Sequence, residues 1–289
     1  MKTALVLEGG ASRGMFSCGV MDVLLQNNII ADYVIGTSAG IANGVSYVSG
    51  QTGRNYRIGM NFYSDKRYMG MKHLLNPKTR SYYNVDFVFD EIPHKYDLFD
   101  YEAFAAVKGN VIACVTNIVT GEAEYLEVPR GKEFSKALVA SCSLPIMFQP
   151  VEIDGNLYMD GGLVDSIPYK KAIDDGCDKV IVVLTRERGY VKEQESMLKL
   201  INIMYKKYPK LLENIADRHN QYNNARKELF ELEKQGKVFL IMPESTGDFS
   251  RVEKRPEKID ELYKQGCKVA NEQLDALKKY LEKQESTKL

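Results

Sequence analysis

The first fifty residues contain two short apolar runs, and each is followed by glycines and then by a helical pattern. The apolar runs are residues 3–7 and 33–35, and the helical patterns begin at residues 14 and 41. Repetition of this strand–glycine turn–helix unit predicts parallel strands, because neighbouring parallel strands need a crossover, usually a helix, between them. Such crossovers cover both faces of a sheet. We therefore expect an α/β fold, a three-layer α/β/α sandwich around a central, mostly parallel sheet.

The rest of the chain adds elements of the same kind, with an irregular stretch in between. Residues 51–100 have no clean period and are expected to form loops and short helices over one end of the sheet. Further strands are expected at residues 111–116, 122–128, 180–184 and 238–242, with a hairpin of 151–153 and 156–159 around Asp154-Gly155. Further helices are expected at residues 135–143, at 196–234 with an interruption near Pro209, and at 259–284.

Length and charge restrict the class of protein. The 289 residues show no internal repeat and no linker, so we expect one domain over 1–289, with a motif-bearing core at about 3–185 and an extension at about 190–289. Lys plus Arg and Asp plus Glu both number 39, which gives zero net charge and argues against nucleic acid as a partner. Without a signal peptide or an apolar stretch of membrane-spanning length, we expect a cytoplasmic protein, possibly peripheral to the membrane. Nothing in the sequence indicates an oligomeric state.

The cysteines give no sign of a metal or redox site. Their number is odd, their spacing is wide, and no C-x-x-C pair is present. We expect reduced thiols in an intracellular protein, with neither a metal nor a cofactor. The five are Cys18, Cys114, Cys142, Cys177 and Cys267.

Ser38 is the strongest candidate for a catalytic residue. It is central in the G-x-S-x-G sequence of residues 36–40, directly after one apolar run and directly before a helical pattern. In this context the serine is held in a sharp turn with its hydroxyl exposed at the start of a helix, while Gly36 and Gly40 allow strand and helix to approach closely. The pattern alone is weak, because a tight turn without chemistry has the same signature.

Two further segments fit the same chemistry. Residues 9–14 form a glycine-rich turn whose backbone N–H groups point outward at a helix N-terminus, as an oxyanion hole requires, with Arg13 adding positive charge. A dinucleotide loop fits less well, because Ala11 interrupts the glycine pattern and Asp32 lies at the wrong end of its strand. Asp160, followed by Gly161 and Gly162, is a carboxylate at the end of an apolar strand, where a plain turn aspartate is the alternative.

A nucleophilic serine needs a base, and histidine is the usual one. His73 and His94 lie in the irregular segment, and His219 lies in a polar helical stretch. The order Ser38, Asp160, His219 matches that of an α/β-hydrolase triad, but that fold places several strands before its serine. Asp160 acting directly as the base of Ser38 fits the sequence better.

Taken together, the motifs resemble those of the bacterial patatin-like phospholipases. The resemblance extends from residue 3 to about residue 185. It is carried by the glycine-rich residues 8–14, the serine motif 36–40, the segment 140–150 and the aspartate motif 160–162. One departure is Ala11, where many members of the family have glycine. The resemblance implies a patatin-like fold, with Gly9, Gly10, Ala11, Arg13 and Gly14 forming the oxyanion hole.

The resemblance also implies a reaction. Ser38 and Asp160 would act as a dyad without histidine, through an acyl-enzyme, on a carboxylic ester of a lipid or on another acyl ester. Calcium would not be needed. Two alternatives remain open at this point. One is an acyltransferase that uses the same dyad, and the other is a catalytically weak, lipid-binding regulatory module.

Access to a lipid would require contact with a membrane surface, which without an anchor or net charge would be transient and apolar. The segment between Asn61 and Leu75 is the best candidate, because it is crowded with aromatic residues, methionines and leucines. An equally good alternative is that these residues fill the core over the end of the sheet. They are Phe62, Tyr63, Tyr68, Met69, Met71, Leu74 and Leu75.

Overall fold

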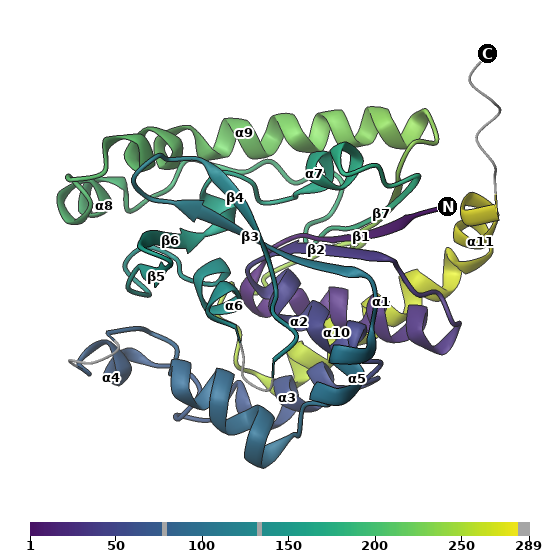
Figure 1. Cartoon of the computed structure of the whole chain (residues 1–289), viewed down its shortest axis with the longest axis horizontal. Helices are drawn as coiled ribbons and strands as arrows, with labels where there is room; N and C mark the ends of the chain where they lie inside the picture. Colours follow the sequence, from purple (N-terminus) through teal and green to yellow (C-terminus); the bar gives the residue numbers. More distant parts are fainter. Residues whose placement is uncertain (77–79, 132–134, 283–289) are drawn as a thin grey trace.

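The fold is built around one mixed sheet (Figure 1). A computed structural model describes residues 1–76, 80–131 and 135–282. Its strand order is β5-β6-β3-β2-β1-β7-β8, with β4 paired to β3, and the strands from β3 to β8 in this order run parallel. The strands are β1 (Thr3–Leu7), β2 (Tyr33–Thr37), β3 (Asn110–Asn117), β4 (Ala123–Glu127), β5 (Val151–Ile153), β6 (Asn156–Asp160), β7 (Lys179–Val183) and β8 (Phe239–Ile241).

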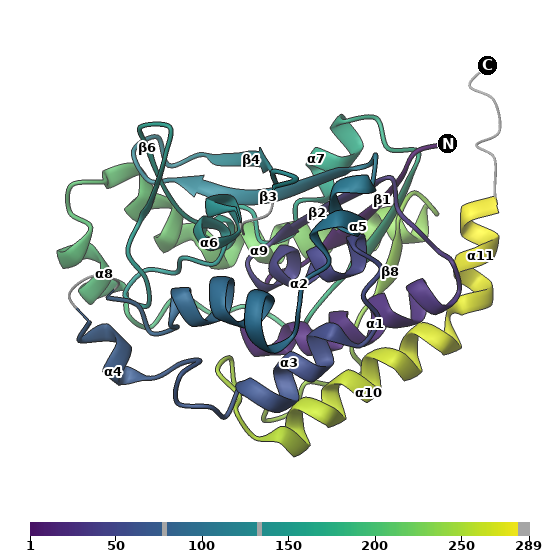
Figure 2. The same cartoon turned by 60° about the horizontal axis from the view of Figure 1, so that its bottom comes forward.

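Helices cover both faces of this sheet, as Figures 1 and 2 show. α7 (Tyr169–Asp174) and α9 (Pro209–Lys234) lie on one face, while α1 (Gly14–Gln26), α2 (Ala39–Val48) and α10 (Pro256–Glu272) lie on the other. The remaining helices are α3 (Arg54–Phe62), α4 (Met71–Leu74), η2 (Phe87–Tyr96), α5 (Tyr101–Ala106), α6 (Lys136–Ser141), α8 (Leu198–Met204), α11 (Leu274–Glu282) and the single turns η1 (Ala11–Arg13) and η3 (Gly161–Leu163). The expected three-layer α/β/α sandwich is confirmed.

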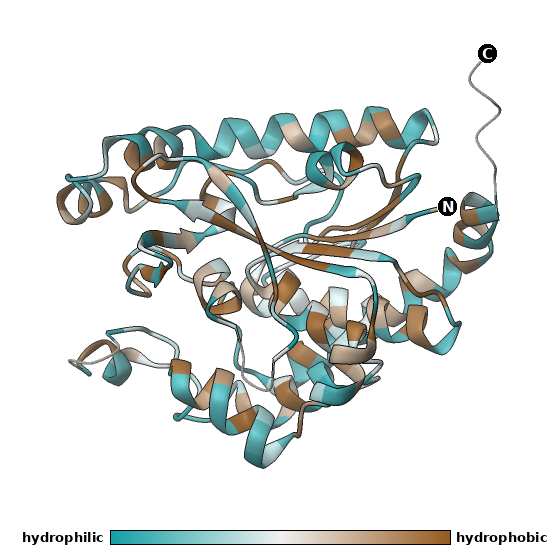
Figure 3. Cartoon of the chain, in the orientation of Figure 1, coloured by the Kyte–Doolittle hydropathy of each residue, from teal (hydrophilic) through white to brown (hydrophobic). Residues whose placement is uncertain are grey.

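The core has one layer on each side of the sheet, because successive strand residues point to opposite faces. In β1, Leu5 and Leu7 pack among the residues of α1 and α2, whereas Ala4 and Val6 pack toward α7 and α9. Figure 3 shows this as hydrophobic central strands, with an outer helix α9 that is mostly hydrophilic. Burial of both sheet faces explains why these strands read as continuous apolar runs in the sequence.

Most of the predicted elements are confirmed. The first strand has the expected limits, the first helix begins at the expected residue 14, and the hairpin turns at Asp154 and Gly155, which both have positive φ (50° and 79°). Pro209 begins α9 and separates it from α8, as the interruption predicted. The expectation of one helix over 259–284 is wrong, because the chain forms α10 and α11 with a break after Glu272; residues 283–284 lie outside the described residues. Two short helices, α5 and α7, were not predicted.

The C-terminal part of the chain is built into the same sheet and layers. Strand β8 pairs in parallel with β7, and α10 packs along α1. This packing is close: a Cβ atom added at Gly266 would lie 2.1 Å from the carbonyl oxygen of Phe16. Among the described residues, no helix is long and apolar enough to cross a membrane. The five cysteines form no disulfide bond.

Candidate active site

Strand β3 brings Ser38 and Asp160 together. Strand β2 runs parallel to β3 and ends with Thr37 opposite Cys114, so Ser38 follows directly. Strand β6 runs antiparallel to β3 and ends with Asp160 opposite Val115, the next residue along β3. The carboxyl ends of β2 and β6 therefore point toward each other at adjacent positions of one strand. This register explains how residues 122 positions apart in the sequence reach one site.

Ser38 lies in a strained turn between β2 and α2. Its φ and ψ are 55° and −130°, a region that residues other than glycine rarely occupy. The turn is possible because α2 starts directly against β1: a Cβ atom at Gly40 would lie 2.4 Å from the carbonyl oxygen of Leu7. Gly36 is equally confined, since its Cβ atom would lie 2.8 Å from the backbone nitrogen of Ile41. Such a turn is expected at a functional site rather than in an ordinary connection.

Ser141 fixes this turn from the opposite side. Its hydroxyl accepts a hydrogen bond from the backbone N–H of Ser38 at 2.8 Å and donates one to the carbonyl oxygen of Cys114 at 2.7 Å. Ser141 is fully buried at the end of α6. It thus joins the serine turn to the strand that also positions Asp160. Ser141 belongs to the segment 140–150, but nothing local in the sequence marks its contact with Ser38.

Asp160 is a buried carboxylate with one free oxygen. Oδ1 accepts the backbone N–H of Gly162 at 2.8 Å, whereas Oδ2 is buried and makes no hydrogen bond of normal geometry with any described residue. Burial raises the pKa of Asp160, while the nearby Ser38 side chain and Arg218 lower it. Arg218 reaches this corner by donating from Nε to the carbonyl oxygen of Gly162. The free oxygen can therefore accept a proton.

The glycines after Asp160 allow the chain to pass close to β3 as it turns. A Cβ atom at Gly161 would lie 2.3 Å from the carbonyl oxygen of Cys114, so a larger residue would push β6 away from β3. The Gly162 N–H holds Oδ1 of Asp160 in place. The aspartate motif thus sets both the position of the carboxylate and its orientation.

The glycine-rich turn between β1 and α1 has two backbone N–H groups without a hydrogen bond to any described residue, those of Gly10 and Ala11. The N–H of Gly9 donates to Ser166, and that of Gly14 donates to the carbonyls of Ala11 and Ser12. The N–H groups of Gly9 and Gly14 are therefore already bonded, which leaves those of Gly10 and Ala11 as the available donors among the described residues of this turn.

Ala11 has a φ of 48°, so it adopts the left-handed conformation in which glycine costs less. Arg13 lies beside this turn, and its Nε is buried without a hydrogen-bond partner among the described residues. Burial and then repulsion by Arg186 and Arg251 lower the pKa of Arg13 to about 10, so it stays charged at neutral pH.

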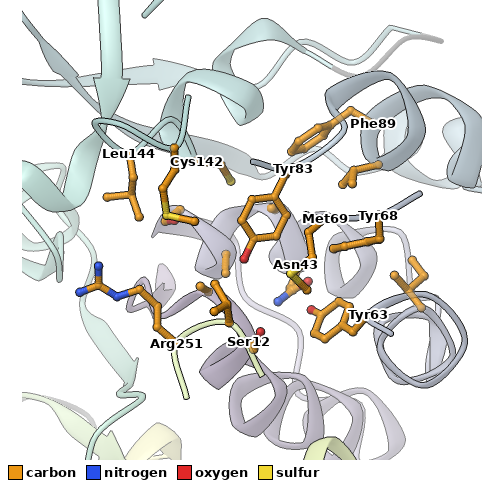
Figure 4. Close-up of a pocket in the computed structure, with 18 of the residues that line it drawn as sticks. Ser12, Asn43, Tyr63, Tyr68, Met69, Tyr83, Phe89, Cys142, Leu144 and Arg251 are labelled. Atoms are coloured by element: carbon orange, nitrogen blue, oxygen red, sulfur yellow. The ribbon is translucent and has the colours of Figure 1, made fainter. Parts of the chain in front are cut away.

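Two cavities meet at Ser38. The first, with a volume of about 110 Å³, is lined mainly by apolar and aromatic side chains from α2, α3 and residues 63–69, 83–89 and 142–148 (Figure 4). The second, of about 50 Å³, is polar and contains Asp160 and the glycine-rich turn. Residues common to both are Ala11, Ser38, Leu144 and Arg251. In Figure 4, Arg251 lies at one end of the apolar cavity, with Tyr63, Tyr68 and Phe89 at the other.

The segment 61–75 divides between the two roles considered for it. Tyr63, Tyr68 and Met69 are buried and line the apolar cavity. Met71 and Leu75, in and just after α4, are 70% and 84% exposed. Neither alternative therefore describes the whole segment: its first part forms the cavity wall and its second part lies on the surface.

The three histidines lie away from the two cavities. His73 contacts the carbonyl of Lys66, His94 pairs with Asp90, and His219 follows Arg218 in α9 without lining either cavity. The described residues contain no group of three or more His, Cys, Asp or Glu side chains arranged to hold a metal ion.

Comparison with known proteins connects this site to a family. A family model described as patatin-like phospholipase matches residues 5–173, and a second, described as a domain of unknown function (DUF6363), matches residues 208–282. The uncharacterised protein YjjU of Escherichia coli (strain K12) is 25% identical over 187 residues, which cover 64% of this chain and 52% of YjjU. Lysophospholipase NTE1 of Candida glabrata is 25% identical over 190 residues, 62% of this chain and 10% of that protein.

The chain thus spans about half of YjjU and a small part of NTE1. Among solved structures, VipD from Legionella pneumophila shares the fold, with a TM-score of 0.51 at 12% identity over 95% of this chain and 67% of VipD. The matched region 5–173 exceeds half of the chain and includes the glycine-rich turn, Ser38 and Asp160. The chain belongs to the patatin-like phospholipase family.

Proposed function

We propose that this protein is a serine hydrolase that cleaves carboxylic esters of lipids through a Ser38–Asp160 dyad. The observation that carries the proposal is the register on β3, which places a strained serine and a buried carboxylate with a free oxygen at adjacent positions. A nucleophile with a base beside it is the arrangement that covalent acyl transfer needs.

In the first step, Oγ of Ser38 attacks the ester carbonyl carbon while Oδ2 of Asp160 takes the hydroxyl proton. Backbone N–H groups of Gly10 and Ala11 stabilise the oxyanion of the tetrahedral intermediate, helped by the positive charge of Arg13. One such donor typically contributes about 3–4 kcal/mol to lowering the barrier. The alcohol leaves with the proton from Asp160, and water then attacks the acyl-enzyme, so the acid is released and Ser38 is restored.

The apolar cavity is the proposed site of the acyl chain. Its volume is about 110 Å³, and apolar and aromatic side chains line most of it. An acyl chain can therefore lie against the wall formed by Tyr63, Tyr68 and Met69. The lysophospholipase NTE1 relatives support a lipid substrate.

We also propose that residues 1–289 act as one domain. β8 and α10 belong to the same sheet and layers as the family core, and Tyr222 of α9 donates a hydrogen bond to Glu8, next to the glycine-rich turn, at 2.6 Å. The C-terminal extension thereby supports the site directly. Transient contact of the protein with a membrane surface would follow from a lipid substrate, and we take the exposed Met71 and Leu75 as the candidates.

The test is labelling with a fluorophosphonate probe, together with hydrolysis of a medium-chain nitrophenyl ester. Ser38→Ala should abolish both labelling and hydrolysis without loss of fold, whereas His219→Ala should retain both. If Ser38→Ala hydrolyses the ester at the wild-type rate, or if His219 is essential, the dyad is refuted. Product analysis with and without an acceptor alcohol separates the hydrolase from the acyltransferase. Absence of both probe labelling and ester turnover by the wild type would indicate the regulatory module instead.

A further inference from the structure

The polar cavity beside Ser38 carries a strong excess of positive charge. Of the described residues that line it, five are basic and two are acidic. The acidic residues are Glu8 and Asp160, and the basic residues are Arg13, Arg186, Lys192, Arg218 and Arg251. Burial of Arg13, Lys192 and Arg218 costs desolvation energy, and a neutral substrate would offer nothing to offset it.

The two carboxylates balance only part of this charge, because five cations face two anions. Glu8 attracts Arg13 and Lys192, while its own oxygens accept from the Tyr222 hydroxyl at 2.6 Å and the Thr185 N–H at 2.5 Å. Asp160 is the proposed base. Among the described residues, the only ion pair that any of the five cations makes is Arg218 with Glu195, at 3.9 Å. Positive charge in the cavity thus exceeds the negative charge beside it.

Two arginine donors beside the cavity are buried without a partner. They are Nε of Arg13 and Nε of Arg186, which make no hydrogen bond with any described residue. The Lys192 ammonium lies over the ring of Tyr222, 4.7 Å from its centroid. Burial and repulsion from Arg218 and Arg251 lower the pKa of Lys192 to about 7. An ammonium held this way would be stabilised by a bound anion.

The volume of the cavity, about 50 Å³, is small and favours a compact anion. Four of the five cations are arginines, whose planar guanidinium groups suit phosphate geometry. A headgroup with its own positive charge would be repelled by the same residues.

We propose that the basic cavity binds a terminal phosphate monoester on the alcohol part of the substrate, so that the preferred substrates are acyl esters of a phosphorylated polyol such as glycerol 3-phosphate. This inference rests on the proposed hydrolase function. The acyl chain then lies in the apolar cavity, the ester carbonyl lies at Ser38, and the phosphate lies among the cations. Hydrolysis consumes one water, breaks the acyl–oxygen bond, and releases a carboxylic acid and glycerol 3-phosphate.

Arg186, Lys192, Arg218 and Arg251 all lie outside residues 5–173, the region matched by the family model. They belong to the segment after β7, to α9 and to the loop before α10. The headgroup preference is therefore a property of the C-terminal part of this chain, and it can differ among proteins that share the same dyad.

The experiment compares three octanoyl esters below their micelle concentration: octanoylglycerol 3-phosphate, octanoylglycerol and octanoylglycerophosphocholine. The variants are Arg186→Gln, Lys192→Gln and the double variant, with Arg188→Gln as the matched control. Arg188 is exposed, pairs with Glu233 at 2.7 Å and lies outside both cavities. The wild type should have its highest kcat/KM on the phosphate ester. The double variant should lose about 10–100-fold on that ester, mainly through KM.

Octanoylglycerol hydrolysis is the internal control for fold and catalysis, and the double variant should retain it. Arg188→Gln should stay within about twofold of wild type on all three esters. Equal kcat/KM values on the three esters, or equal losses by the double variant on charged and neutral esters, would overturn the phosphate site while leaving the hydrolase intact.

Binding to Ser38→Ala, measured by calorimetry, tests the site separately from turnover. Octanoylglycerol 3-phosphate should bind this variant more tightly than inorganic phosphate does, and the addition of Arg186→Gln and Lys192→Gln should weaken its binding. If the variant binds inorganic phosphate as tightly as octanoylglycerol 3-phosphate, and if octanoylglycerol does not compete for binding, the cavity is a site for free phosphate. That result would refute the headgroup role. If the wild type cleaves none of the esters, the hydrolase fails, and the calorimetry still decides whether the cavity binds phosphate.

Discussion

Replacement of Asp160 by asparagine should reduce activity and increase stability at the same time. The change keeps the shape of the side chain and an oxygen that can accept the Gly162 N–H, which now binds Oδ1 at 2.8 Å. It removes the proton acceptor Oδ2 and the negative charge. Asp160 is only 2% exposed, and burial is the largest influence on its pKa, which is raised overall despite the attraction of Arg218 and Arg251.

The sign of the stability change follows from that pKa. A raised pKa means that the folded protein binds the proton more tightly than the unfolded chain does, so the ionised carboxylate destabilises the fold above its folded-state pKa. Each tenfold change in proton affinity corresponds to about 1.4 kcal/mol, which for a domain of this size is a Tm difference of about 2–3 °C. Asp160→Asn should therefore melt higher than wild type at neutral pH. The gain should shrink as the pH falls and disappear below the ordinary aspartate pKa of 3.8.

The loss of activity should be about 10²–10⁴-fold in kcat, because the general base is removed. Hydrolysis of a nitrophenyl ester at neutral pH and calorimetric Tm from pH 3 to pH 8 provide the two measurements. The wild-type enzyme should lose kcat/KM on acidification with a midpoint above 3.8, since protonated Asp160 cannot accept the Ser38 proton.

The matched control is Asp165→Asn. Asp165 is also a carboxylate whose pKa is raised by burial, but it accepts from Tyr125 at 2.8 Å and does not line either cavity. This variant should keep most of its activity. Equal loss in both variants would show that activity follows buried charge in general, and full activity of Asp160→Asn would refute its role as base. A lower Tm for Asp160→Asn would refute the argument from burial.

Three further changes test neighbouring features. Ser141→Ala should lower Tm and kcat together, because the Ser38 N–H and the Cys114 carbonyl lose their buried partner at a cost of about 1–3 kcal/mol; an unchanged kcat would contradict its positioning role. Ala11→Gly keeps the N–H and relieves a φ of 48°, so activity should persist with stability changed by no more than about 1 kcal/mol in a denaturant titration. Met71→Ser with Leu75→Ser should reduce hydrolysis on vesicles more than on a soluble ester, and equal losses would place lipid access elsewhere.

A second group of exposed apolar residues lies on helix α8, and it can be tested on vesicles in the same way. Helix α8 has Leu200, Ile203 and Met204 on its surface, with 41%, 71% and 50% exposure. In both views of the fold, α8 and α4 lie at the same end of the molecule (Figures 1 and 2). Serine substitutions in α8 can therefore be compared directly with those in α4 on the same vesicles.

The sequence predicted the fold well where the signal is local. The apolar runs at residues 3–7 and 180–184 are buried on both faces, so their composition is sufficient to mark them as central strands. The break between α10 and α11 has no proline or glycine to announce it, and the short helices α5 and α7 span fewer than two full turns. Such elements are determined by their packing partners rather than by their own period.

The site shows the same division between local and long-range information. Ser38 and Asp160 could be selected from their own neighbours, because a strained turn and a strand end both need glycine beside them. What joins them is the register of β3, in which Cys114 and Val115 are consecutive, and no residue near Ser38 or Asp160 encodes it. Ser141 and the basic cavity depend equally on tertiary contact. Arg186 and Arg218 look like ordinary surface charges in the sequence. They line the cavity beside Ser38 only because the C-terminal part of the chain folds against the glycine-rich turn.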